Sequence, residues 1–93
     1  MTFGYKADSL TFDEYKEITK INWFPETPEK SEKISFYYTH DGFLPDYSFY
    51  LSYDLPIDIK IDTINYVNGD FTKRRTFEII GNIKRVVYSE NQQ

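Results

Sequence analysis

Few residues in this chain of 93 could do acid–base chemistry. His40 is followed directly by Asp41, and a carboxylate beside an imidazole can orient that ring as a general base. The chain has one histidine and no cysteine, and no serine lies in a Gly-x-Ser-x-Gly context. We interpret His40 as a solvated turn residue and predict neither catalytic residues nor enzymatic activity. A catalytic pair of carboxylates, as in glycosidases, remains an alternative, because the distance between two carboxylates depends on the fold.

The sequence predicts no metal site and no cofactor. Zinc sites need several histidine or cysteine ligands, which this chain lacks. Five aspartates could supply calcium oxygens, but their spacing does not match an Asp-x-Asp-x-Asp-Gly loop. They are Asp41, Asp46, Asp54, Asp58 and Asp62. The glycines are isolated, so we expect no glycine-rich phosphate loop.

The net charge of −4 argues against direct nucleic-acid binding, which needs a basic surface for the phosphates. It leaves open a basic protein partner, or an inhibitor that imitates nucleic acid. No segment approaches the roughly 20 apolar residues that span a membrane. Residues 1–6 lack the basic and apolar blocks of a signal peptide. We expect a cytoplasmic protein, or a secreted or periplasmic one if a leader has been removed.

A capping box predicts one helix, over residues 12–20. Thr11 is the expected N-cap and Glu14 stands three residues later, so each can bond the other's backbone N–H. Apolar side chains at Phe12, Tyr15 and Ile18 then recur at helical spacing. A helix this short needs tertiary packing, so its aromatic stripe is expected to lie on a sheet.

Alternating side chains predict the strands. Residues 34–39 and 47–53 alternate between apolar and other positions, with a connecting turn over residues 40–46. In residues 57–62 three isoleucines alternate with three charges, which predicts a third strand with one dry face.

Two glycine turns are expected to set the register of the remaining strands. We predict a three-residue loop at residues 68–70, which pairs Ile59 with Ile79 and Ile61 with Phe77. A two-residue loop at Gly81 and Asn82 would pair Phe77 with Val86. The same registers would align Lys60, Glu78 and Arg85 across three strands.

These elements predict a single α+β domain over residues 1–93. One N-terminal helix packs on a four- to five-stranded antiparallel sheet, which is a meander of hairpins. This order resembles in outline the cystatin-like arrangement of one helix against a curved sheet. The sequence contains no cystatin motif, so the resemblance implies no function.

Aromatic side chains are the main functional hint. Nine tyrosines, eight phenylalanines and one tryptophan make up 19% of the chain, more than one small core needs. The predicted registers leave Tyr37, Tyr50, Ile64 and Tyr66 on the outer sheet face, unless residues 24–33 cover them. Trp23 either closes the edge of the core or anchors a binding partner.

We therefore expect a non-enzymatic protein-interaction module, such as a small acidic inhibitor or regulator of microbial or phage type. Its partner would be another protein or a second copy of the chain, bound through the exposed aromatic face. The alternatives are the globular domain of a secreted or envelope-associated protein or lipoprotein, and a small enzyme or ligand carrier.

Overall fold

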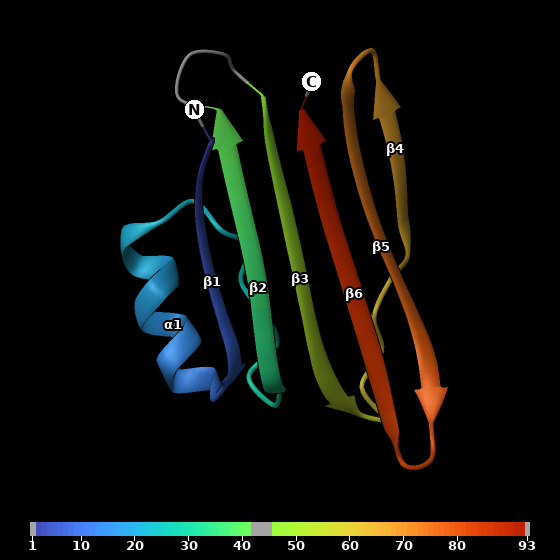
Figure 1. Ribbon diagram of the computed structural model, residues 1–93. Helices are drawn as coiled ribbons and strands as arrows, with labels where there is room; N and C mark the ends of the chain where they lie inside the picture. The colour runs from blue at the N-terminus through green and yellow to red at the C-terminus, as the bar shows by residue number, and fades with distance from the viewer. Residues whose placement is uncertain (1, 42–45, 93) are drawn as a thin grey trace.

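The computed structural model describes residues 2–41 and 46–92, with side chains for residues 5–40 and 46–92. One helix packs on a six-stranded antiparallel sheet (Figure 1), so the predicted α+β class is confirmed with one or two more strands than expected. In chain order the elements are β1 (Thr2–Leu10), α1 (Phe12–Ile21), β2 (Glu32–Asp41), β3 (Tyr47–Pro56), β4 (Ile64–Asn68), β5 (Phe71–Ile80) and β6 (Ile83–Gln92). The predicted connecting turn includes residues 42–45, which lie outside the described residues.

The strand order in the sheet is β1-β2-β3-β6-β5-β4, so the sheet is not a simple meander. The chain leaves β3 at the centre, crosses to the far edge and returns through β4, β5 and β6. The described termini therefore lie at the β1 edge and beside the sheet centre. Strand β1 was not predicted from the sequence, although Phe3, Tyr5 and Ala7 alternate with polar residues or glycine over residues 2–8.

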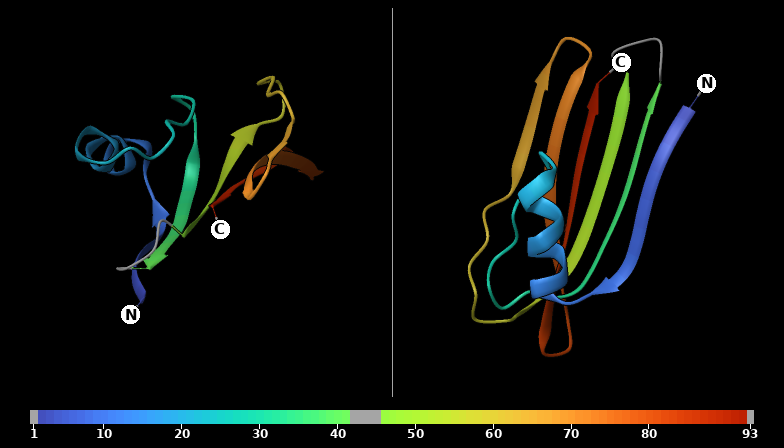
Figure 2. Two further views of the ribbon diagram at one scale, coloured as in Figure 1. Left: turned by 90° about the horizontal axis from the view of Figure 1, so that it is seen from above. Right: turned by 90° about the vertical axis from the view of Figure 1, so that its left-hand side faces the viewer.

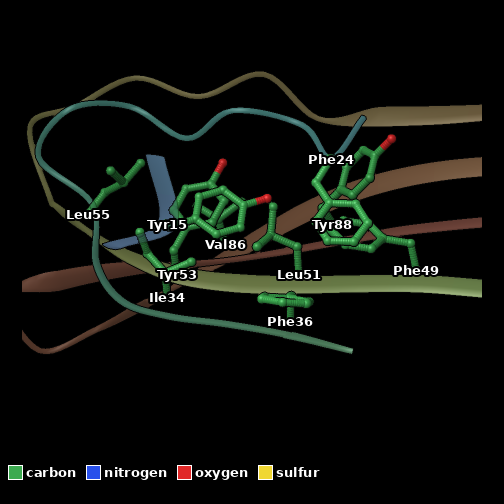
Figure 3. Packing of buried hydrophobic residues seen from close by; sticks show 10 residues of the cluster. All are labelled: Tyr15, Phe24, Ile34, Phe36, Phe49, Leu51, Tyr53, Leu55, Val86 and Tyr88. Atoms are coloured by element: carbon green, nitrogen blue, oxygen red, sulfur yellow. The ribbon is translucent and has the colours of Figure 1, made fainter. Parts of the chain in front are cut away.

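The side chains of β3 and β6 show that one face of the sheet is buried and the other is exposed. Alternate side chains of β3 are buried, as predicted, and they share their face with alternate side chains of β6. The buried apolar cluster consists of Tyr15, Phe24, Ile34, Phe36, Phe49, Leu51, Tyr53, Leu55, Val86 and Tyr88 (Figure 3). We call the face that bears this cluster the helix-side face, and the opposite one the outer face.

Helix α1 forms where the capping box predicted it. The Thr11 hydroxyl accepts from the Glu14 N–H at 3.2 Å, and the Glu14 carboxylate accepts from the Thr11 N–H at 2.9 Å. Tyr15 is the buried residue of the helix, and its ring packs against Phe36 of β2. Its hydroxyl donates to the Pro25 carbonyl at 2.7 Å, which joins the helix to the segment that follows it.

The predicted third strand is wrong. Residues 57–63 form a turn and an irregular segment, because β6 takes the place beside β3 that this segment was expected to fill. The segment covers the helix-side face instead, where Ile59 and Ile61 pack against the core. Lys84 donates to the Ile59 carbonyl at 2.7 Å and Arg75 donates to the Asp62 carbonyl at 2.6 Å, so two cations of the sheet hold the segment in place.

Of the two predicted glycine turns, one is confirmed and one is wrong. The predicted Gly81-Asn82 turn is confirmed: Phe77 lies opposite Val86, and Glu78 lies opposite Arg85. The predicted loop at residues 68–70 is wrong, because Asn68 pairs with Phe71 and only Gly69 and Asp70 lie between them. Gly69 has a φ of +62°, which glycine adopts at low cost.

That one-residue slip exchanges the faces of the edge strand. Ile64 lies opposite Arg75, and Tyr66 lies opposite Lys73, so both face the helix side and not the outer face. Lys60 lies in the irregular segment, so the predicted row of three charges reduces to the Glu78 and Arg85 pair.

The capping box gives the first test. The Thr11→Ala variant loses the N-cap acceptor, and we expect the free energy of unfolding to fall by about 1 kcal/mol. Urea denaturation followed by circular dichroism measures the change. Thr63 is exposed in the irregular segment, so Thr63→Ala is the control and should change stability by less than about 0.5 kcal/mol. Equal losses in the two variants would contradict the assigned role of Thr11.

Candidate functional site

Two exposed tyrosines form the centre of the outer face. Tyr37 of β2 lies directly opposite Tyr50 of β3, so the two side chains stand next to each other on one side of the sheet. They are 48% and 46% exposed. The strand alternation predicted this placement, because it put the neighbours of both tyrosines in the core.

The tyrosine pair borders a shallow hollow of about 290 Å³ that crosses β2 and β3. Val87 of β6 closes one side of it, because β6 lies next to β3 in the sheet. The hollow is lined by Asp8, Ser35, Phe36, Tyr37, Tyr50, Leu51, Ser52 and Val87. Val87, Ser35 and Ser52 were not among the predicted binding residues. Adjacency of β3 and β6 is what brings Val87 there, and no local pattern in the sequence indicates that adjacency.

Among the described residues, the elements that cover the sheet all contact its other face. Helix α1 packs there through Tyr15, residues 23 and 24 pack there through their rings, and the irregular segment is held there by Lys84 and Arg75. Figure 2 shows the helix and both connecting segments on the same side of the curved sheet. Residues 24–33 therefore do not cover Tyr37 and Tyr50.

Small hydroxyl side chains surround the tyrosines on the outer face. By strand register they are Ser35, Thr39, Ser48, Ser52, Thr72, Thr76 and Ser89. The described charged side chains on this face are Lys6, Asp8, Glu32, Asp54, Arg74, Glu78 and Arg85. Three are basic and four acidic, so this face is nearly balanced although the whole chain carries −4.

One ion pair on this face is bidentate. The Arg85 guanidinium donates to both carboxylate oxygens of Asp54, at 2.9 and 3.3 Å, across adjacent strands. Asp54 is buried and accepts two parallel bonds, an arrangement that arginine's planar fork favours. The paired carboxylate also raises the pKa of the arginine, first through these hydrogen bonds and then through its charge.

The structure separates the five predicted binding residues into two groups. Tyr37 and Tyr50 lie together on the outer face, whereas Ile64, Tyr66 and Trp23 lie on the helix side. Trp23 is 51% exposed, but its ring contacts the buried rings of Phe24 and Phe49 and the ring of Tyr47. It therefore lies against the edge of the core, which is the first of its two predicted placements.

A buried carboxylate lies on the helix-side face. Glu90 accepts hydrogen bonds from the hydroxyls of Tyr47 and Tyr88, each at 2.5 Å. Burial, followed by the hydrogen bond and negative charge of Glu90, raises the pKa of both phenols above the usual value. The two phenols compensate for the removal of this carboxylate from water, so we assign the group a structural role.

His40 does not form the catalytic pair considered from the sequence. Its ring stacks on Tyr38 on the helix-side face, and the Asp41 side chain lies outside the described residues. Within the described residues, no group of three histidine, cysteine, aspartate or glutamate side chains could hold a metal ion. The one described helix is too short and too polar to cross a membrane.

Comparison with known proteins gives no functional assignment. No protein-family model, curated protein or solved structure matches this chain. The features that could indicate a function are therefore those of the described surface, above all the open tyrosine pair.

The buried phenols give a prediction on pH dependence. Tyr88 keeps its proton in the folded chain at a pH where the unfolded chain has lost it, so its contribution is complete below about pH 10 and declines above it. We expect the free energy of unfolding to fall above pH 10, by up to about 1.4 kcal/mol per pH unit for each such group.

Urea denaturation between pH 8 and 11 measures this loss. The Tyr88→Phe variant has one fewer buried phenol, so its stability should fall less steeply with pH than that of the unmodified chain. The exposed Tyr37→Phe variant is the matched control and should retain the original slope. A Tyr88→Phe slope equal to that of the control would show that this phenol is not held in its neutral form.

Proposed function

We propose that this chain is a non-enzymatic protein-interaction module that acts as a small acidic inhibitor or regulator. It binds a protein partner through the outer face, with Tyr37 and Tyr50 at the centre of the contact. The observation that carries this proposal is the exposure of two adjacent tyrosines on a sheet face that no described segment covers.

The composition of the face supports a protein partner. Tyrosine offers a large, partly apolar contact area at low cost in conformational entropy, and serine supplies adaptable hydrogen bonds. Tyr37 and Tyr50 stand among such hydroxyl side chains, including Ser35 and Ser52 at the hollow. Antibody combining sites use the same combination of residue types to bind proteins.

The size of the face also suits a protein interface. Five neighbouring strands of nine or ten residues span roughly 24 Å by 30 Å, from a strand spacing near 4.8 Å and a rise near 3.3 Å per residue. This area of about 700 Å² is close to the roughly 800 Å² that each partner buries in an interface of standard size. The face can therefore hold a stable contact without help from another domain.

Charge favours protein over nucleic acid. The described outer face has four acidic and three basic side chains, and one pair of them is used in the bond between Asp54 and Arg85. A phosphate backbone needs several unpaired cations, and among the described residues this face offers only Lys6 and Arg74 besides the paired Arg85. The single histidine lies on the other face, so it cannot act as the base that would activate Ser35 or Ser52 as a nucleophile.

Affinity capture tests the proposal with a matched control. Immobilised chain is exposed to lysate of its source cells, and bound proteins are identified by mass spectrometry. We expect a partner that is retained by the unmodified chain and by Tyr66→Ser, but lost by the Tyr37→Ser/Tyr50→Ser double variant. Tyr66 is 49% exposed on the opposite face, so this control removes an equally accessible tyrosine.

Sedimentation of the same variants separates a foreign partner from a second copy. Self-association that the double variant abolishes would assign the face to a homodimer. Equal capture by the double variant and the unmodified chain would reject the outer face as the binding surface. Unfolding curves of all three proteins confirm that the substitutions leave the fold intact.

A further inference from the structure

A second surface lies at the β1 edge, on the side of the sheet opposite to the tyrosine pair. Here α1 and β1 enclose an open groove of about 560 Å³. Its lining residues are Tyr5, Lys6 and Ala7 of β1, Ile18 and Ile21 of α1, and Asn22, Phe24 and Phe36. The groove is therefore lined mainly by apolar side chains.

The groove contains apolar surface that stays exposed to solvent in the folded chain. Ile21 is 85% exposed at the end of α1, and Tyr5 is exposed on the facing strand. Ala7 is small, so it leaves room for a larger side chain between the helix and the strand. Figure 2 shows α1 and β1 facing each other at this end of the sheet.

Strand β1 also has a free backbone edge. Among the described strands it pairs with β2 alone, so alternate N–H and C=O groups of β1 point away from the sheet. The pairing is regular from Thr2 to Ala7 and shifts between Ala7 and Leu10, where Ser9 has a φ of 55°. An added strand could pair with the regular part of this edge.

Two charges mark the outward side of the same edge strand. Lys6 and Asp8 lie on the outer face, one on each side of Ala7. In the described ranges 2–41 and 46–92, the ion pairs found are Lys20 with Glu17 and Arg85 with Asp54, and neither involves Lys6 or Asp8. An incoming strand can therefore match both charges without breaking an existing pair.

We propose that this groove takes an extended segment of a partner protein, which adds to β1 as an antiparallel strand. Its large apolar side chains enter the groove opposite Tyr5 and Ala7. Its intervening side chains are acidic opposite Lys6 and basic opposite Asp8. This site is independent of the outer-face contact proposed above, because it uses the sheet edge and the other face.

The geometry favours a single segment over a second copy of the chain. Helix α1 lies outside β1 at the same edge (Figure 1), so little more than one strand has access to the groove. Pairing of two β1 strands around a two-fold axis would bring a second α1 to this edge, since such a contact repeats the same surface on both sides. An extended segment brings no such obstacle.

Two peptides of equal composition test the proposal. The blocked hexapeptide Thr-Lys-Leu-Glu-Leu-Thr places Glu opposite Lys6 and Lys opposite Asp8 when it pairs antiparallel, and Thr-Glu-Leu-Lys-Leu-Thr reverses both charges. Titration into isotopically labelled chain is followed by amide chemical shifts. We expect saturable shifts in β1 and the last turn of α1, with the first peptide binding about two- to thirtyfold more tightly.

Substitutions then assign the contacts. The Lys6→Asp/Asp8→Lys double variant should reverse the preference between the two peptides. Ile21→Ser should weaken binding of the first peptide, whereas Val67→Ser, at the opposite sheet edge, should not. The Tyr37→Ser/Tyr50→Ser variant should bind the peptide normally, so failure of one proposal is distinguishable from failure of the other.

Three outcomes of the peptide titration would overturn this assignment. They are the absence of saturable shifts at millimolar peptide, equal binding of the two peptides, and shifts centred on β4 or the outer face. Concentration-dependent shifts of β1 without any peptide would assign the edge to a second copy of the chain, which also contradicts the proposal.

Discussion

The packing of aromatic rings around Phe49 is the interaction on which the rest of the structure depends. Phe49 is fully buried near the start of β3, a central strand of the sheet, and its ring centroid lies 4.6 Å from that of Phe24 in a stacked arrangement. Phe36 of β2 and Tyr88 of β6 contact it from the two neighbouring strands. The connecting segment and three strands thus meet at one side chain (Figure 3). Because this packing draws the covering elements to one face, it leaves the other face of the sheet open.

Much of the fold could be predicted from local patterns. The capping box located α1, the alternation of β3 identified its buried face, and Gly81 set the register of β5 against β6. The position of β6 beside β3 could not be predicted, because it depends on contacts far apart in the sequence. Residues 57–62 show why: isoleucines that alternate with charges suit a strand, but they also suit an irregular segment that packs Ile59 and Ile61 on the core.

The candidate site could be predicted in part for the same reason. Tyr37 and Tyr50 were placed on the correct face because both lie in strands whose buried neighbours are evident from the sequence. Ile64 and Tyr66 were misplaced by a single residue of register, since Asn68-Gly69-Asp70 is compatible with more than one loop. The groove beside β1 was not predicted, because the alternation in residues 2–8 was not interpreted as a strand and no local pattern indicates that α1 lies beside it.

The central claim is that one face of the sheet is packed and the other is open to solvent. A soluble paramagnetic reagent, which broadens the signals of exposed groups, tests it directly along β3. The account predicts strong broadening for the side chains of Ser48, Tyr50 and Ser52, and weak broadening for those of Phe49 and Leu51. Equal protection of Tyr50 and Phe49 would contradict the account, because it would show that the tyrosine pair is covered.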